Sequence, residues 1–174
     1  LANEMYLDSA DLRASVVSLA KQVGYTPRSA VAPVANIDVV VNNAIGSSIT
    51  MSRGTKFATT VDGQAYSFVN NSDITIIPAD GVYKFSNIDV YEGTYLNYKY
   101  TVNSSDIDQR FIIPNNSVDT ATLTVKVQES SSDSTTNNYT LSTGITTLDS
   151  TSKVYFLQEV ENGRYEVYFG DGVL

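Results

Sequence analysis

The 174-residue sequence contains no cysteine, no histidine and no tryptophan. Without cysteine, disulfide bonds and thiol chemistry are excluded. The absence of histidine removes the side chain that titrates closest to neutral pH and the commonest metal ligand. No apolar run approaches the roughly 20 residues of a membrane-spanning helix, so we expect no membrane partner.

Positive charge is also scarce, because 11 Lys and Arg residues face 19 Asp and Glu residues, for a net charge of −8. The cations are scattered from Arg13 to Arg164 instead of being clustered. Such a chain repels a phosphate backbone, so nucleic acid is not an expected partner. Tyr, Ser, Thr, Asn and Val dominate instead, a composition typical of strands and turns.

Arrangements of residues that support catalysis are missing too. There is no histidine base, no Ser-x-x-Lys motif and no glycine-rich phosphate loop. Two carboxylate pairs, Asp106 with Asp108 and Glu159 with Glu161, have the i, i+2 spacing of one strand face, but solvated surface charge explains them better than glycoside hydrolysis. Oxygen-rich stretches do not fit the calcium-loop spacing. We expect no enzymatic activity, cofactor, metal or small-molecule substrate.

One amphipathic α-helix is predicted near the N-terminus, over residues 9–23. Ser9 is a favourable N-cap, and Gly24 and Pro27 have the positions of helix-ending residues. The predicted apolar stripe consists of residues with helical spacing, namely Leu12, Val16, Leu19, Ala20 and Val23.

From residue 30 onward the pattern predicts roughly ten strands spaced by about ten residues. Hairpin turns are expected at Asp62-Gly63, Glu92-Gly93 and Asn162-Gly163. Helices do not alternate with these strands, which excludes a parallel α/β sheet. The predicted fold is mainly β, an antiparallel β-sandwich or barrel-like domain preceded by one amphipathic α-helix. We place a helical segment at 1–33 and the β domain at 34–174.

Three sets of residues are candidates for contact with a partner. The polar run 130–138 favours a mobile hairpin tip or an adaptable binding loop. Tyrosines gather in the central region, where they either cover the core or form a face for protein or sugar. They are Tyr83, Tyr91, Tyr95, Tyr98 and Tyr100. Glycines at strand junctions indicate turn geometry or close approach to a partner. They are Gly54, Gly93, Gly170 and Gly172.

Five stretches occur in the order found in one protein family. They are "YLDSADLRASVVSLAKQVGYTPRSAVAP" (6–33), "ITMSRGTKF" (49–57), "VYEGTYL" (90–96), "FIIPNNSVDTATLTVKV" (111–127) and "YFLQEVENGRYEVYFGDGVL" (155–174). In these stretches the chain resembles the baseplate wedge proteins of contractile-tailed bacteriophages, the gene product six group of the baseplate J-like family. The resemblance covers nearly the whole chain and is weakest over 128–153.

The resemblance implies a structural component of the phage tail baseplate, which acts through protein–protein assembly and not catalysis. Its partners would be neighbouring baseplate subunits, including copies of itself. Its location would be the virion, after synthesis in the bacterial host cytoplasm. We also expect the chain to be a fragment of a longer protein, since two apolar residues follow its last Gly-Asp-Gly turn.

Two other functions stay open. A receptor- or glycan-binding adhesin domain would explain the richness in Tyr, Asn and Thr, but not the helix that precedes the strands. A polysaccharide-degrading tail enzyme would require a catalytic carboxylate pair, which the sequence does not reveal.

Overall fold

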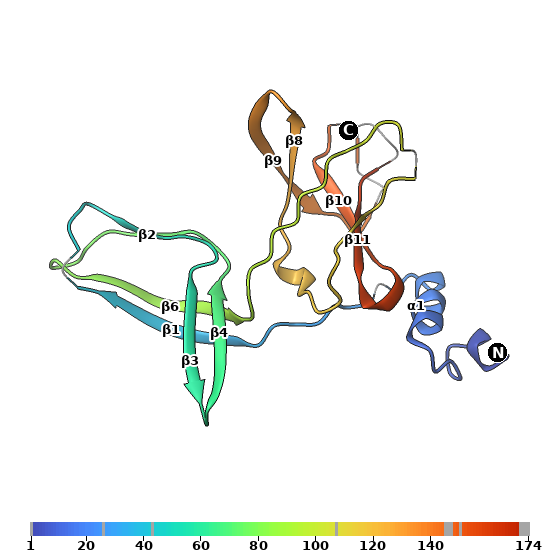
Figure 1. Cartoon of the computed structure of the whole chain (residues 1–174), viewed down its shortest axis with the longest axis horizontal. Coiled ribbons are helices and arrows are strands. Elements are labelled where there is room, and N and C mark those ends of the chain that lie inside the picture. Colours follow the sequence, from blue (N-terminus) through green and yellow to red (C-terminus); the bar gives the residue numbers. More distant parts are fainter. Residues whose placement is uncertain are drawn as a thin grey trace. The chain divides into compact units, whose positions relative to one another are not determined.

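The computed structural model describes residues 2–25, 27–42, 44–106, 108–144, 148–149 and 151–170. The chain forms two compact units (Figure 1). Unit 1 comprises Leu1–Val31 and Tyr98–Leu174, and unit 2 comprises Ala32–Asn97. The prediction of a mainly β, antiparallel fold with a helix near the N-terminus is confirmed. The division into domains at 1–33 and 34–174 stays a prediction. In the part of the chain described, no helix is long and apolar enough to cross a membrane.

Unit 2 contains a four-stranded antiparallel sheet with the strand order β1-β6-β4-β3. A separate two-stranded antiparallel sheet pairs β2 with β5. The strands are β1 (Val34–Val41), β2 (Ile49–Met51), β3 (Lys56–Val61), β4 (Gln64–Asn70), β5 (Ile74–Ile76) and β6 (Tyr83–Glu92). The predicted hairpin at Asp62-Gly63 is confirmed, and the φ angles of 51° and 81° fit a type I′ turn.

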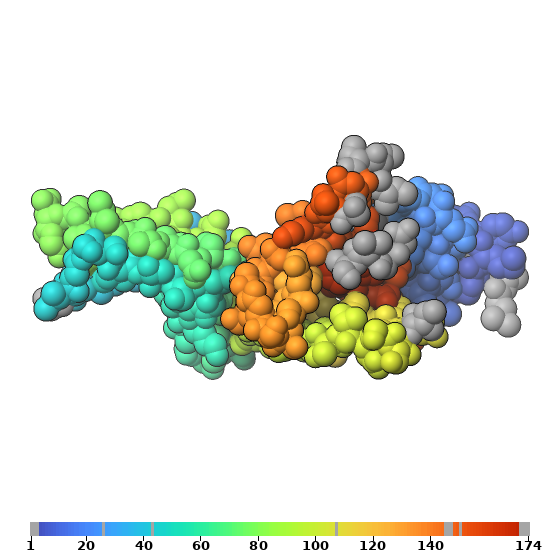
Figure 2. All heavy atoms as spheres, turned by 90° about the horizontal axis from the view of Figure 1, so that it is seen from above, coloured from blue at the N-terminus to red at the C-terminus, as the bar shows by residue number. Residues whose placement is uncertain are grey.

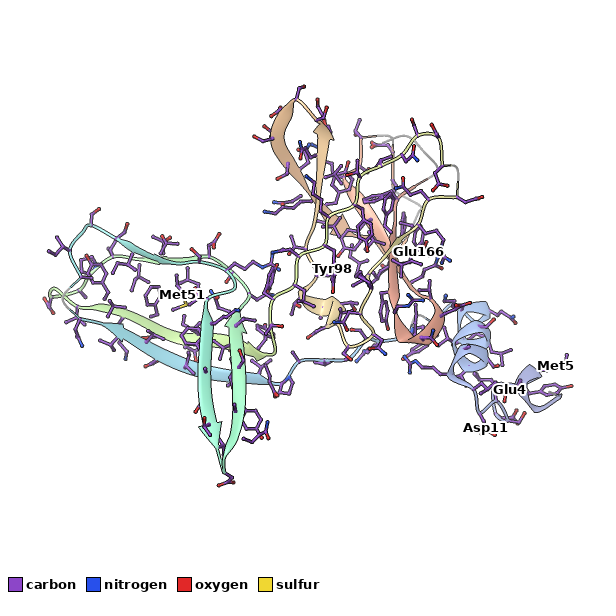
Figure 3. All side chains as sticks on the ribbon, viewed as in Figure 1. Glu4, Met5, Asp11, Met51, Tyr98 and Glu166 are labelled. Carbon is purple, nitrogen blue, oxygen red and sulfur yellow. The ribbon has the colours of Figure 1, made fainter. Side chains whose placement is uncertain are left out.

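A β-bulge in β6 keeps the apolar side chains of unit 2 in its core. Phe85 and Ile88 are both buried although they are three residues apart, which strict alternation would not allow. The extra residue is accommodated at Asn87, where φ is 59° and the backbone N–H donates to Asp38 Oδ1 at 2.9 Å. The buried core consists of Met51, Phe85, Ile88 and Val90, of which Figure 3 labels Met51.

The predicted hairpin at Glu92-Gly93 is wrong. Strand β6 ends at Glu92, and residues 94–103 form no strand. The reason is that both edges of β6 are already occupied, since Tyr91 pairs with Val34 of β1 on one side and with Val69 of β4 on the other. No edge is left for the residues that follow.

Unit 1 contains a five-stranded sheet with the order β7-β11-β10-β9-β8. All neighbours are antiparallel except β9 and β10, which are parallel. The strands are β7 (Phe111–Ile112), β8 (Val125–Ser130), β9 (Asp133–Leu141), β10 (Val154–Glu159) and β11 (Tyr165–Tyr168). The predicted Asn162-Gly163 turn is confirmed, as a short 3-10 helix, η3 (Glu161–Gly163), with φ angles of 60° and 72° at these residues.

The core of unit 1 is rich in tyrosine. Leu123, Val125 and Val127 have the alternate spacing of residues on one strand face, and all three pack against this core. The short helix η2 (Thr120–Thr122), which directly precedes Leu123, is capped by Asp119, whose side chain accepts from the backbone N–H of Ala121. The buried core residues are Ile113, Tyr139, Tyr155, Tyr165 and Val167.

The polar run 130–138 forms the end of a β-hairpin and not an irregular loop. Ser130 is the last residue of β8, Ser131 and Ser132 form the turn, and the remaining residues belong to β9, which pairs with β8 (orange in Figure 2). Apolar residues are unnecessary here because both faces of this part of β9 are largely exposed. Asp133 stabilises the start of the strand, since its Oδ1 accepts from the backbone N–H of Thr135 at 2.9 Å.

The helix α1 (Arg13–Gln22) begins four residues later than predicted, and its N-cap is Leu12 instead of Ser9. A preceding 3-10 helix, η1 (Ala2–Met5), brings Glu4 to this end, where its carboxylate accepts from the N–H groups of Asp11 and Leu12 at 3.2 Å (Figure 3). Glu4 therefore accepts from the N–H of the N-cap residue and of the residue before it, whereas the N-cap residue itself provides no side-chain acceptor.

The C-terminal end of α1 agrees with the prediction. Gly24 has φ of 77°, and its N–H donates to Lys21 O at 3.0 Å. The buried face is shifted from the predicted stripe, because Val17 and Ala20 are buried whereas Leu12 and Val23 are exposed.

Candidate functional site

The five predicted tyrosines are divided between the two units. Tyr83, Tyr91 and Tyr95 belong to unit 2, and Tyr98 and Tyr100 belong to unit 1. Tyr83 is only 2% exposed, and its hydroxyl donates a hydrogen bond to the carbonyl oxygen of Gly46. Its side chain therefore belongs to the core of unit 2. That the five form one interaction surface stays a prediction.

Tyr95 lies against two residues of the β2–β3 connection. The Arg53 guanidinium carbon is 4.6 Å from the centre of the Tyr95 ring, a cation–π contact. Gly54 has φ of 80°, and a Cβ placed there would lie 3.7 Å from the Tyr95 side chain. Among the predicted residues, Gly54 and Tyr95 are thus brought into contact with each other.

Tyr98 and Tyr100 remain accessible, with 43% and 42% of their surface exposed. The Tyr100 hydroxyl donates to the carbonyl oxygen of Ile112, and its ring meets Phe111 edge-on with the ring centres 5.8 Å apart. Partial burial raises the pKa of the Tyr100 hydroxyl, and the proximity of Tyr98 adds to this effect. Tyr100 therefore ties this segment to β7 while it leaves part of its ring open.

The predicted turn glycines differ in conformation. Gly54 and Gly93 have positive φ angles of 80° and 122°, and the N–H of Gly93 donates to Ser67 O at 2.8 Å. Gly170 lies in a bend, and its φ is outside the positive region. Gly172 lies outside the described residues.

A buried ion pair, which was not among the predicted site residues, attaches α1 to β10. The Glu159 side chain is 1% exposed and accepts from Arg13 Nε at 2.7 Å and from Arg13 Nη2 at 2.9 Å. Lys21 Nζ donates to the backbone oxygen of Glu159 at 2.5 Å. Two cations on one face of α1 thus hold the same residue of the sheet.

A second buried carboxylate lies on the neighbouring strand. Glu166 is 5% exposed and receives two bonds of 2.7 Å from the Arg110 guanidinium (Figure 3 labels Glu166). Gln158 Nε2 donates to the same carboxylate at 2.7 Å. Arg110 lowers the pKa of Glu166, against the opposing effect of burial. Each buried carboxylate is therefore paired with an arginine in a two-bond geometry.

The alternation of side chains along a strand could have identified Glu159 as a buried residue. Glu159 lies on the same face of its strand as Tyr155 and Leu157, which face the core, so its carboxylate needed a cation there. Nothing in the local sequence identifies Arg13 as that cation.

In each of the two candidate catalytic carboxylate pairs, one carboxylate makes a structural contact. Glu159 is bound by Arg13, and Asp106 Oδ1 accepts from the backbone N–H of Asp108 at 3.2 Å. Among the described residues, no group of three or more Asp, Glu, His or Cys could hold a metal ion. What the arrangement provides is rigid attachment of α1 and an exposed strand-like segment.

The stability of unit 1 should depend on pH through Glu166. Its pKa in the fold is lower than its ordinary value of 4.5, so the ionised form stabilises the fold above that pH. This contribution is lost as the pH falls through the lowered pKa. The Glu166→Gln variant should therefore be less stable than the parent protein at neutral pH, and the deficit should shrink in acid.

Urea denaturation from about pH 7 to about pH 3 measures this deficit. The Arg110→Gln variant is the matched test, because it should remove the same pH-dependent contribution to the free energy of unfolding. A deficit that stays constant over the whole pH range would contradict the prediction.

Comparison with known proteins gives two matches. Residues 97–174 match the family model described as "Bacteriophage baseplate wedge protein gp6, third domain". The start of this match lies one residue before unit 1 resumes at Tyr98. "Baseplate wedge protein gp6" of Enterobacteria phage T4 is 27% identical over 173 residues, which cover 97% of this chain and 25% of that protein. The chain thus spans about a quarter of the length of this curated relative.

Proposed function

We propose that this chain is a member of the gp6 family of bacteriophage baseplate wedge proteins and a structural part of a phage tail baseplate. It acts through contacts with other proteins and not through catalysis. It would be made in the bacterial host and incorporated into the virion. Its partners are neighbouring baseplate subunits, among them copies of the protein to which it belongs.

One observation carries this proposal: the match to the third domain of gp6 coincides with the C-terminal part of unit 1. The likeness to the T4 protein supports it along most of the remaining sequence. No feature of the described residues favours the adhesin alternative over this role.

The structure suggests where contacts with neighbours form. The sheet of unit 1 ends at β8, whose outer edge has no strand partner in the part of the chain described. The exposed tyrosines Tyr98 and Tyr100 combine a large ring with a polar tip, a property that suits protein interfaces. A stable contact would need to bury roughly 800 Å² on each partner.

Immunogold electron microscopy of the phage that encodes this chain tests the proposal. Gold-labelled antibody raised against the chain should mark the plate below the tail sheath. Antibody previously absorbed with the purified chain is the control and should leave the plate unmarked. Labelling of fibre tips instead of the plate would overturn the proposal and favour the adhesin.

A further inference from the structure

The segment 98–103, with the sequence Tyr-Lys-Tyr-Thr-Val-Asn, has the pattern of a strand but no strand partner in the part of the chain described. Its even-numbered residues are large, apolar in part and exposed, at 43% for Tyr98, 42% for Tyr100 and 71% for Val102. Figure 1 draws this stretch, in yellow-green after β6, as an extended ribbon without an arrow. An extended segment whose backbone N–H and C=O groups are unpaired can pair with a strand of another chain.

One edge of this segment is already closed by a side chain. Gln109 Nε2 donates to Thr101 O at 2.8 Å, and Gln109 Oε1 accepts from the Asn103 N–H at 2.8 Å. The amide of Gln109 thus takes the place of one residue of a neighbouring strand. In an extended strand, alternate residues direct their backbone groups to opposite edges, so the even-numbered residues face the other edge.

That other edge is open. Within the described residues, no hydrogen bond engages the backbone N–H or C=O of Tyr98, Tyr100 or Val102. Tyr100 nevertheless holds the segment in place, through its hydroxyl bond to Ile112 and its edge-on contact with Phe111. The segment is therefore anchored on one side and has unpaired backbone groups on the other.

We propose that this open edge pairs, in antiparallel fashion, with residues 98–103 of a second copy of the chain, about a two-fold axis at Tyr100. The sequence is self-complementary in this register. Tyr100 meets Tyr100, and Tyr98 meets Val102, which are aromatic and aromatic–β-branched cross-strand pairs of the favourable kind. Lys99, the one charged residue of the segment, meets Thr101 and not another Lys99.

The pairing must act against the net charge of −8 on each copy. Charge repulsion between copies is screened by salt, with a Debye length of about 8 Å at physiological ionic strength and about 3 Å at 1 M. Dimerisation should therefore strengthen as the salt concentration rises. The inference names a partner for the assembly role proposed above and rests on that role only for its biological setting.

Cross-linking with introduced cysteines tests the register, since the chain has no cysteine of its own. In the proposed pairing, Lys99 lies opposite Thr101 in a non-hydrogen-bonded pair, with Cα atoms about 4.5 Å apart, which permits a disulfide. Two Lys99 residues, or two Thr101 residues, lie about 8 Å apart, beyond disulfide reach. A mixture of the Lys99→Cys and Thr101→Cys proteins should form an oxidised dimer, whereas each protein alone should not.

A second pair of variants tests the edge itself. Val102→Pro removes an N–H from the open edge, whereas Thr101→Pro removes one from the edge that faces Gln109. In sedimentation velocity at high salt, Val102→Pro should weaken dimerisation at least about tenfold, and Thr101→Pro should weaken it much less. Circular dichroism checks that both variants are folded.

Cross-linking of the single-cysteine proteins to the same extent as the mixture would overturn the register. A parent chain that stays monomeric at every salt concentration, with no cross-link in the mixture, would overturn the proposal as a whole. Both measurements use the purified chain and not the phage. A negative result would therefore contradict the pairing alone, whereas the baseplate role is tested separately by immunogold microscopy.

Discussion

Replacing Phe85 with alanine should lower the free energy of unfolding of unit 2 by about 3–5 kcal/mol. The Phe85 side chain is 2% exposed and packs in the small core formed with Met51, Ile88 and Val90. The change removes most of one ring from this core and leaves a cavity that the flanking strands can fill only in part. Urea denaturation followed by hydrogen exchange, resolved by residue, measures the loss.

The same experiment reports whether the two units unfold separately. Because unit 1 has its own core, around Tyr155 and Tyr165, the amides of 108–144 and 151–170 should keep their protection in the Phe85→Ala protein. Val61→Ala is the matched control, since Val61 is 53% exposed and its truncation should cost less than about 0.5 kcal/mol. Equal loss of protection in both units would mean that they form one cooperative structure.

The second large effect is expected from Arg13→Ala. Removal of one partner from a buried ion pair costs about 3–5 kcal/mol, and we expect a value near 2–3 kcal/mol because the Arg13 side chain is 62% exposed. The cost arises from Glu159, whose carboxylate is left buried without its cation. Thermal and urea unfolding measure it, and loss of helix signal at low denaturant would report detachment of α1.

A double-mutant cycle separates the ion pair from the packing of Arg13. The double variant Arg13→Ala/Glu159→Gln should be more stable than Arg13→Ala alone, because no charge is then left buried. Lys21→Ala is a matched control on the same helix, and it should cost only about 1 kcal/mol because Lys21 bonds an uncharged backbone oxygen, so its loss leaves no buried charge without a partner. Strictly additive effects of Arg13→Ala and Glu159→Gln would contradict this account of the pair.

Features that depend on neighbouring residues could be predicted from the sequence. The Asp62-Gly63 turn follows from two residues that accept positive φ, and the end of α1 follows from Gly24. The alternation of Leu123, Val125 and Val127 likewise indicated the face that packs on the core of unit 1. In each case the residues that determine the structure lie within a few positions of one another.

Features that depend on distant strands could not be predicted. The Glu92-Gly93 pair has turn chemistry, but β1 and β4 occupy both edges of β6, and β1 lies about fifty residues earlier. The start of α1 depends on Glu4 in a preceding turn, which outweighs the favourable capping chemistry of Ser9. The polar composition of 133–138 does not indicate a strand. These residues form one because β8 supplies their backbone hydrogen-bond partners.

The candidate site was predicted only in part. The sequence singled out Tyr98 and Tyr100, which are exposed on the segment proposed to pair, because tyrosine alternation is visible locally. It did not reveal that Gln109 closes one edge of that segment, since this depends on how the chain turns at 103–106. Nor did it reveal the partner of Glu159, which lies 146 positions away.

The separation of Arg13 from Glu159 has a consequence for how the protein forms on the ribosome. All six strands of unit 2 lie within 32–97, so they are complete before any strand of unit 1 has been synthesised. Helix α1 is made before unit 2 but finds its binding site only when β10, more than 130 positions later in the sequence, has emerged. Contacts between such remote positions form slowly. Unit 2 should therefore fold early during translation, and docking of α1 should be among the last steps.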